Sequence, residues 1–369
     1  MLRLLLLSTP VGPLGSGLGG GVEATVINLA QVLVERGHTV EIAAPKGSFF
    51  PKGSPLSDKL SLIQSPGILQ PTAQTQGRQA PVVTESALSN MWDYARQVQS
   101  RYDLLVNFAY DWLPFYLTPF LSTPVVHFVS MGSLSDRLDE AIVQVSDRFP
   151  GRLGAYSQTQ ADTFEGVRYW EILGCGLDME QYVYGDRPDD CVAWIGRISP
   201  EKGLEDAIAA AALAEKPLKI FGKLEDEAYW ERLQSLIRRV QQTVQQTIEI
   251  EYCGFLATPA LQEKVGRSQA LLMTPKWTEA FGIVAIEALA CGVPVVAYRR
   301  GGPAEIVRDG ENGWLVEPDD VDGLVAAIGR VGEINRGTCR EGAIASYSLS
   351  AWGRRFERWF CRILSEPIA

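Results

Sequence analysis

Short apolar runs alternate with segments of helical period through most of this sequence, and this alternation constrains the fold more than any other feature. Strands that alternate with helices are typical of α/β proteins with parallel sheets. The pattern opens with a predicted strand at 2–8, a helix at 22–36 and a strand at 39–44. The further strands predicted for this first series are 60–64, 104–108, 124–129 and 153–157.

A second alternating series follows the polar stretch 184–190, which we interpret as a hinge. Its predicted strands are 191–198, 218–221, 248–252, 270–273, 294–297 and 314–316. At about 150 residues per domain, a chain of 369 residues also suggests two domains. We predict two Rossmann-like, doubly wound domains, 1–186 and 187–348, that face each other across a cleft.

The last predicted helix, 349–367, has a strong apolar face. We expect it to dock back on the first domain. Three arginines keep membrane binding open as an alternative: Arg354, Arg355 and Arg358.

The charge balance excludes some partners. The chain has 34 basic and 44 acidic residues and a net charge of −10, which disfavours nucleic acid and anionic lipid. No apolar run approaches the roughly 20 residues that span a bilayer, so we expect no stable membrane association. Any phosphate that the protein binds must be small and held locally.

Six scattered cysteines and only two histidines make a structural zinc site or a disulfide framework improbable. Reduced, buried thiols are typical of cytoplasmic proteins. We expect a cytoplasmic protein whose first residues form a buried strand, not a signal peptide.

The segment 196–203 lies between a predicted strand and a helix expected to begin near Pro200. A helix N-terminus favours anions, and Arg197 and Lys202 add two cations within one turn of it. This pattern predicts a diphosphate site. The alternative is an arginine and a lysine on a solvated loop.

Two glutamates, Glu279 and Glu287, flank a helix start at Phe281 and Gly282. Glycine lets a ligand approach the backbone, and a carboxylate is a natural acceptor for vicinal hydroxyls of a sugar or ribose. A carboxylate buried in an otherwise apolar helix is costly without a partner. The pattern therefore favours a binding role for Glu287.

Together these motifs resemble the family 4 retaining glycosyltransferases of GT-B fold. The most specific part is the pair Glu279 and Glu287, followed by 288–297 and 301–307; segments 196–203 and 174–178 come next. The resemblance covers nearly the whole chain. It implies a nucleoside diphosphate sugar as co-substrate, with no metal and no other cofactor.

The resemblance also assigns roles. Arg197 and Lys202 would hold the diphosphate and stabilise the leaving group, Glu279 would contact the sugar, and Glu287 would bind the ribose. The backbone facing the diphosphate, sugar and base would come from Gly20, Gly21, Phe255, Leu256, Ala280, Phe281, Gly282 and Ile283.

His127 matches a histidine that in this family lies beside the reacting sugar. A lone histidine on an apolar strand is more often a core residue. Because of the resemblance, we instead expect His127 to lie in the active site. Arg197, Lys202 and Glu279 complete the expected catalytic set. The acceptor would be bound by Gly15, Ser16, Tyr110, Asp111, Trp112 and Phe128. The rings of Tyr110, Trp112 and Phe128 could stack on a flat heterocycle, and core packing is the alternative for Trp112.

Two competing motifs are weaker. Residues 15–20 match the dinucleotide pattern G-x-G-x-x-G, but the match begins about seven residues after the strand, and no acidic residue ends the second strand. Asp320-Val321-Asp322 imitates a metal motif, although Asp319 and Asp320 precede a helix and are better N-caps. We expect neither a dehydrogenase nor a metal site.

The resemblance therefore implies a retaining hexosyltransferase that uses UDP-glucose and small-molecule acceptors. The opening residues 8–23 resemble cyanobacterial enzymes that glucosylate tetrahydrobiopterin. Alternatives are a nucleotide-sugar-binding protein without turnover, a sugar-nucleotide epimerase, or a transferase with a sugar or lipid acceptor. Oligomeric state is not predicted.

Overall fold

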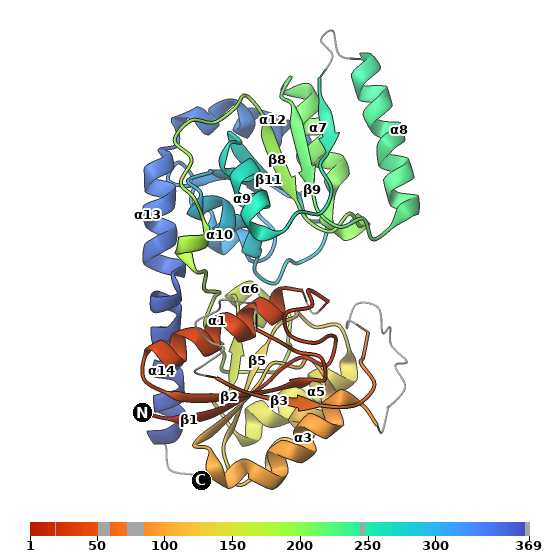
Figure 1. Cartoon of the computed structure of the whole chain (residues 1–369). Coiled ribbons are helices and arrows are strands. Elements are labelled where there is room, and N and C mark those ends of the chain that lie inside the picture. Colours follow the sequence, from red (N-terminus) through yellow and green to blue (C-terminus); the bar gives the residue numbers. More distant parts are fainter. Residues whose placement is uncertain (19, 51–59, 72–84, 244–247, 366–369) are drawn as a thin grey trace. The chain divides into compact units, whose positions relative to one another are not determined.

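The computed structural model describes residues 1–18, 20–50, 60–71, 85–243 and 248–365 (Figure 1). Contacts divide the chain into two compact units, Met1–Gly176 with Leu349–Ala369, and Leu177–Ser348. The boundary at 176/177 lies ten residues before the predicted 186/187. The reason is that Leu177 pairs with Ser348 and Tyr182 bonds to Glu287, which tie 177–186 to the second unit.

The first unit is built on a seven-stranded parallel sheet of order β3-β2-β1-β4-β5-β6-β7. Its strands are β1 Arg3–Leu7, β2 Thr39–Pro45, β3 Ser61–Ser65, β4 Leu104–Asn107, β5 Val125–Val129, β6 Leu153–Ala155 and β7 Glu171–Ile172. Leu4 to Leu7 are fully buried, as expected of a central strand covered on both faces. The short edge strand β7 was not predicted, because two residues give no periodic signal.

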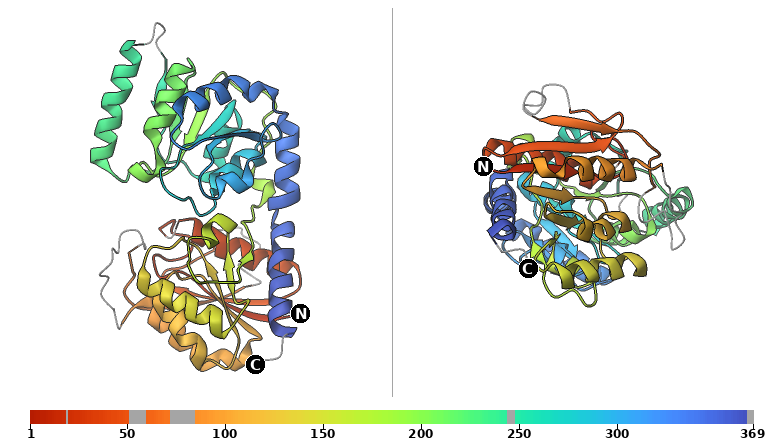
Figure 2. Two further views of the ribbon diagram at one scale, coloured as in Figure 1. Left: turned by 180° about the vertical axis from the view of Figure 1, so that it is seen from behind. Right: turned by 90° about the horizontal axis from the view of Figure 1, so that it is seen from below.

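Helices cover both faces of this sheet (Figures 1 and 2). Their bounds are α1 Gly21–Glu35, α3 Ala87–Val98, α4 Trp112–Leu117, α5 Asp136–Arg148, α6 Gln158–Ala161 and α14 Leu349–Ser365. α1 and α14 lie side by side on one face, while α3 and α5 cover the other. The helix α1 ends at Glu35 with Arg36 as its C-cap, and Gly37 follows with φ of +87°, a left-handed conformation that suits glycine.

The helix α14 packs on the first unit through its aromatic face. Trp352 and Trp359 donate their indole N–H groups to the carbonyl oxygens of Gly174 (3.1 Å) and Gly151 (2.7 Å). Phe356 between them is fully buried. The apolar face predicted from the sequence is thus covered by protein in this structure.

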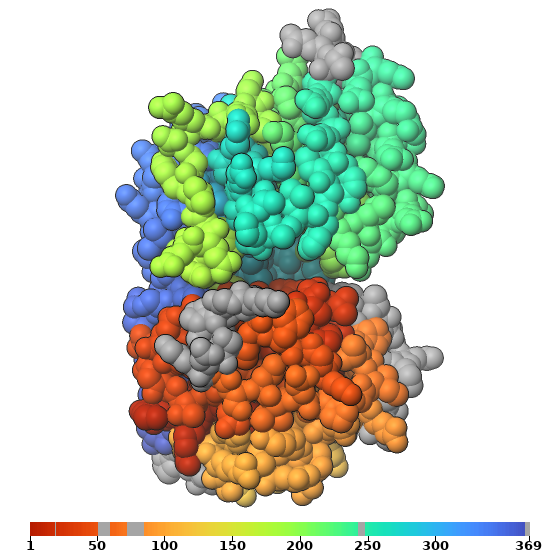
Figure 3. All heavy atoms as spheres, in the orientation of Figure 1, coloured from red at the N-terminus to blue at the C-terminus, as the bar shows by residue number. Residues whose placement is uncertain are grey.

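The second unit contains a six-stranded parallel sheet of order β10-β9-β8-β11-β12-β13. Its strands are β8 Val192–Ile195, β9 Leu218–Phe221, β10 Ile250–Tyr252, β11 Ala270–Met273, β12 Val295–Tyr298 and β13 Gly313–Val316. Its helices are α7 Leu204–Leu213, α8 Glu227–Thr243, α9 Thr258–Gly266, α10 Ile283–Ala290, α11 Pro303–Ile306, α12 Val321–Arg330 and α13 Arg336–Tyr347. In the space-filling view, α8 and α9 form much of this unit's surface, green to turquoise (Figure 3).

All six cysteines are free thiols, and four of them are buried. Within the described residues, no helix is long and apolar enough to cross a bilayer.

The packing of α14 on α1 can be tested at Gly353. A Cβ on Gly353 would lie 2.5 Å from a methyl group of Val32, so Gly353→Ala should push α14 away from α1 and cost about 1–3 kcal/mol. Gly342→Ala in α13 is the matched control, because a Cβ there meets nothing within 4 Å. It should stabilise the protein by up to about 1 kcal/mol. Thermal unfolding by circular dichroism measures both, and equal midpoints for the two variants would contradict the packing described here.

Candidate functional site

The strand order of the second sheet creates a switch point between β8 and β11. β9 lies on one side of β8 and β11 on the other, so the connections after β8 and β11 diverge. In parallel sheets, ligands bind outside the carboxyl ends of the strands at such a point. Arg197 follows β8 by two residues and Glu279 follows β11 by six. Topology thus brings the loops that carry Arg197 and Glu279 to the same end of the sheet.

Lys202 and Glu279 form an ion pair although they lie 77 residues apart in sequence. Their side chains are only 19% and 16% exposed. Trp277 completes the cluster: its Nε1 donates to Glu279 Oε2 at 3.2 Å, and Lys202 Nζ lies 5.1 Å from its ring centroid. Trp277 was not predicted, and its only sequence signal is an aromatic residue two positions before Glu279.

Backbone contacts hold the two loops of this pair together. The Thr274 hydroxyl donates to the carbonyl oxygen of Gly203 at 2.7 Å, and the Lys276 N–H donates to that of Glu201 at 2.9 Å. Gly203 has φ of +63°, and a Cβ on it would overlap the carbonyl oxygen of Thr274. Only glycine fits this close approach.

The helix predicted to begin near Pro200 is therefore interrupted. Pro200–Lys202 is a short 3-10 turn, and α7 begins after Gly203, at Leu204. Lys202 consequently extends from the turn instead of from a regular helix. The sequence pattern did not show that Gly203 adopts a left-handed conformation.

Gly301 and Gly302 support the loop that carries Glu279. The Gly302 N–H donates to the carbonyl oxygen of Glu279 at 2.7 Å. A Cβ on Gly301 would lie 2.5 Å from the Glu279 nitrogen, and one on Gly302 would overlap the backbone of Phe281. These contacts give a structural role to Gly301 and Gly302, the first two residues of the motif 301–307, to which the sequence analysis gave no role.

Arg197 is held by two carboxylates. Its NH1 donates to Glu225 at 2.6 Å and its NH2 to Glu201 at 3.0 Å. The Ser199 hydroxyl also donates to Glu201, at 2.7 Å. The cation predicted for the diphosphate is therefore already paired in the free protein.

Gly282 precedes α10 with φ of +91°, and Phe281 beside it is buried. Glu287 lies in the second turn of α10 and accepts a hydrogen bond of 3.0 Å from the Tyr182 hydroxyl. Burial raises the pKa of Glu287 to about 7, although the Tyr182 bond acts in the opposite direction. Tyr182 was not predicted as a partner, because it precedes the assigned hinge.

Ala280 and Ile283, on either side of Phe281 and Gly282, are half-buried in this loop and first helical turn. Phe255 and Leu256 follow β10, which lies two strands away from β8 in the sheet. Neighbouring strands are about 4.8 Å apart. Phe255 is 75% exposed. The structure thus leaves its ring uncovered beside the strand ends.

Asp319 and Asp320 have structural roles. The Asp320 carboxylate accepts from the Gly323 N–H at 2.8 Å and caps α12, as predicted. Arg300 and Lys276 pair with Asp319 at 2.7 and 2.9 Å and lower its pKa to about 2. In the described part of the chain, no group of three or more His, Cys, Asp or Glu residues could hold a metal ion.

In the first unit, Glu23 organises the glycine-rich loop. Its carboxylate accepts from the N–H groups of Gly15 (3.0 Å) and Gly17 (3.1 Å) and from the Ser16 hydroxyl (3.3 Å). In this structure the Gly15 N–H and the Ser16 hydroxyl, which were expected to bind the acceptor, therefore form hydrogen bonds within the loop. Gly20 precedes α1 and Gly21 begins it, whereas Gly19 lies outside the described residues.

Tyr110, Asp111 and Trp112 follow β4, which neighbours β1 at the switch point of the first sheet. The Tyr110 hydroxyl donates to the Gly132 carbonyl at 2.9 Å, and Asp111 caps α4 through the Leu113 N–H at 2.9 Å. Burial raises the pKa of Asp111. Trp112 is 45% exposed and stacks on Tyr116, with 4.4 Å between centroids.

His127 is a core residue, so its predicted place beside a sugar is wrong for this structure. It lies in the middle of β5, where its fully buried ring stacks on Phe115 at 4.2 Å. Asn107 donates to Nδ1 at 3.2 Å, and Nε2 lies 2.9 Å from the Thr118 hydroxyl oxygen. Burial and the charge of Arg152 lower the pKa of His127 to about 3. A neutral, fully bonded imidazole results.

Phe128 was predicted to contact the acceptor and is likewise part of the core. It faces the opposite side of β5 from His127 and packs on Phe108, Tyr156 and Phe356, with centroids 4.6–5.9 Å apart. Aromatic character alone did not distinguish a mid-strand residue from a strand-end one.

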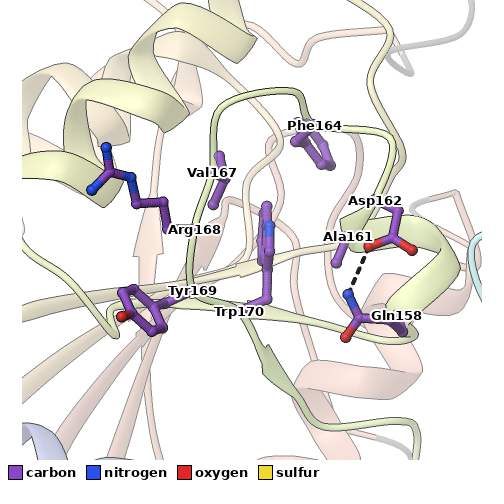
Figure 4. Close-up of a pocket in the computed structure, with 8 residues that line it drawn as sticks. All are labelled: Gln158, Ala161, Asp162, Phe164, Val167, Arg168, Tyr169 and Trp170. Atoms are coloured by element: carbon purple, nitrogen blue, oxygen red, sulfur yellow. Dashed lines mark hydrogen bonds between the residues drawn. The ribbon is translucent and has the colours of Figure 1, made fainter.

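A separate pocket of about 420 Å³ lies in the first unit between α6 and β7 (Figure 4). Trp170 stands at its centre, and Gln158 donates to Asp162 at 2.7 Å on one wall. None of the predicted donor or acceptor residues lines it. We therefore place the site at the strand ends, where the topology and the paired charges coincide.

Residues 186–340 match the family model for glycosyl transferases, group 1. The match covers less than half of the chain, and this segment is similar to the group 1 glycosyl transferases. It contains every residue of the second-unit site from Arg197 to Glu287.

Among curated relatives, the D-inositol 3-phosphate glycosyltransferase of Acidothermus cellulolyticus is 32% identical over 46% of this chain and 40% of its own. The enzyme of that name from Segniliparus rotundus is 26% identical over 95% and 89%. The chain spans half or less of the length of the first curated relatives that it matches.

The solved structure of HepE from Anabaena in complex with UDP is 20% identical over 98% of this chain and 100% of HepE, with a TM-score of 0.75. Similarity at this identity concerns the fold. The two parallel-sheet α/β domains of this chain match the GT-B fold, as predicted.

The raised pKa of Glu287 predicts a pH-dependent cost of folding. Between its ordinary value of 4.5 and about 7, the folded protein keeps a proton that the unfolded chain releases, so rising pH destabilises the fold. Glu287→Gln retains an acceptor for Tyr182 and removes this cost. The variant should match wild type near pH 4.5 and be more stable by about 1–3 kcal/mol at pH 8. Urea unfolding at both pH values measures this, and a difference that does not change with pH would show that Glu287 is not the cause.

Proposed function

We propose that this chain is a retaining glycosyltransferase that transfers glucose from UDP-glucose to a small acceptor. The observation that carries the proposal is the Lys202–Glu279 pair at the switch point of the second sheet, with Arg197 beside it on the same loop. The group 1 family match over this segment supports it. HepE, which shares the fold, was solved with UDP-glucose, and this supports the choice of donor.

Each charged group then has a task. Arg197 and Lys202 bind the diphosphate and stabilise the negative charge that develops on it as the bond to the sugar breaks. Electrostatic stabilisation of this kind often makes the largest single contribution to lowering the activation barrier. As Lys202 turns to the phosphate, Glu279 becomes available for the sugar hydroxyls. Glu287, once ionised, accepts the ribose hydroxyls. The backbone from Ala280 to Ile283 and the residues Gly20, Gly21, Phe255 and Leu256 remain proposed donor contacts.

We assign retention to front-side attack, in which the leaving phosphate accepts the proton of the acceptor. This route needs no protein base, which agrees with the burial and full hydrogen bonding of His127. We also propose that the reaction needs no metal ion. The roles of Asp319 and Asp320 in an ion pair and a helix cap support this.

For the acceptor we propose a small molecule, with tetrahydrobiopterin as the first compound to test. The exposed ring of Trp112, beside the switch point of the first sheet, supports a flat acceptor. Sugar and lipid acceptors are the alternatives. We propose a cytoplasmic setting, which the six free thiols support.

Lys202→Ala and Glu279→Gln should each lower the rate of UDP release at least tenfold, because each removes a contact that acts on the transition state. Lys216→Ala is the matched control. Lys216 pairs with Asp190 before the amino ends of β9 and β8, away from the carboxyl ends that carry the site, so its loss should leave the rate unchanged. Rates within twofold of wild type for both site variants would show that the site is assigned wrongly.

The substrates are tested by release of UDP or GDP from a panel of nucleotide sugars. Acceptors should include tetrahydrobiopterin, monosaccharides and glycerol lipids, with mass spectrometry of the product. EDTA should leave the rate unchanged, whereas loss of activity restored by Mn²⁺ would contradict the metal-free route. Tight binding of UDP-glucose without turnover with any acceptor would favour a nucleotide-sugar-binding protein.

A further inference from the structure

The two carboxylates on Arg197 are not equivalent. Glu201 lies in the 3-10 turn, and it also accepts from the Ser199 hydroxyl, while its carbonyl oxygen accepts from the Lys276 N–H. Its position is thus fixed by three contacts. Glu225 lies in the connection from β9 to α8 and its side chain is 37% exposed. In the described part of the chain, its carboxylate is bonded to Arg197.

Arg197 therefore has a fixed partner and a movable one. A guanidinium can form two parallel bonds with a phosphate, but NH1 is already bound to Glu225 at 2.6 Å. An anionic ligand has to displace the Glu225 carboxylate to take that donor. The displaced carboxylate moves into water at small cost, because it is already partly exposed.

We propose that Glu225 sets the affinity of this site for phosphate-bearing ligands by competing with them for Arg197. This inference rests on the proposed function. The competition weakens the binding of UDP, the product whose release must follow each transfer. Glu225 thus acts on affinity through Arg197 and touches neither the sugar nor the reacting atoms.

The size of the effect follows from the exposure of the pair. Exposed ion pairs change an equilibrium by about two- to fivefold. Glu225→Gln should therefore lower the Kd for UDP by about two- to fivefold at low salt. The gain should shrink as salt rises, because both the ion pair and the ligand charge are screened.

Glu227→Gln is the matched control. Glu227 is exposed and lies two residues after Glu225, at the start of α8. Its substitution removes the same charge from a side chain that does not contact Arg197. Isothermal titration of UDP into wild type and both variants should show tighter binding for Glu225→Gln alone. Equal gains for the two variants would overturn the proposal in favour of a long-range effect of net charge.

A double-variant cycle separates this inference from the proposed function. In an Arg197→Ala background, Glu225→Gln should no longer change the Kd for UDP, because the contested donor is gone. If wild type binds UDP and Glu225→Gln leaves the Kd unchanged or raises it, the inference fails and the proposed function stands. If wild type binds neither UDP nor UDP-glucose, the proposed function fails and the inference with it.

Discussion

The second-unit site depends on one interaction, the ion pair between Lys202 and Glu279. It joins the loop after β8 to the loop after β11, the two strands that flank the switch point. Because both side chains are mostly buried, neither charge can be left alone without a substantial cost. The pair is therefore stable in the free protein and is ready to be exchanged for a ligand that offers an anion to the lysine and hydroxyls to the carboxylate.

The backbone around the pair makes this geometry possible. Gly203 lies against the carbonyl of Thr274, and Gly301 and Gly302 lie against the backbone of Glu279 and Phe281. None of these three positions has room for a Cβ atom. Ordinary side chains there would separate the loops and, with them, the two charges. Glycine is thus needed at these positions by the close approach of one chain segment to another, as well as by the left-handed conformation of Gly203.

Much of this arrangement could be predicted from the sequence, because strands and amphipathic helices leave periodic signals. The strand positions, the parallel sheets and the presence of a cation loop and a carboxylate loop follow from such signals and from the family motifs, whereas the ion pair between the two loops does not. The failures have a common cause. His127 and Phe128 lie in the middle of β5, where side chains face helices and not the strand ends, and a strand-length run does not show which residue ends it. The left-handed conformation of Gly203 and the hydrogen bonds of Tyr182 and Trp277 arise from tertiary structure, which a local sequence pattern does not show.

The most direct test of the central claim is a crystal structure of the protein with a bound UDP-sugar. The account predicts that the diphosphate contacts Lys202 and Arg197, that the Lys202–Glu279 pair is broken, and that the Glu279 carboxylate accepts hydrogen bonds from the sugar. A nucleotide bound elsewhere, or one bound at the strand ends with the Lys202–Glu279 pair intact, would contradict it.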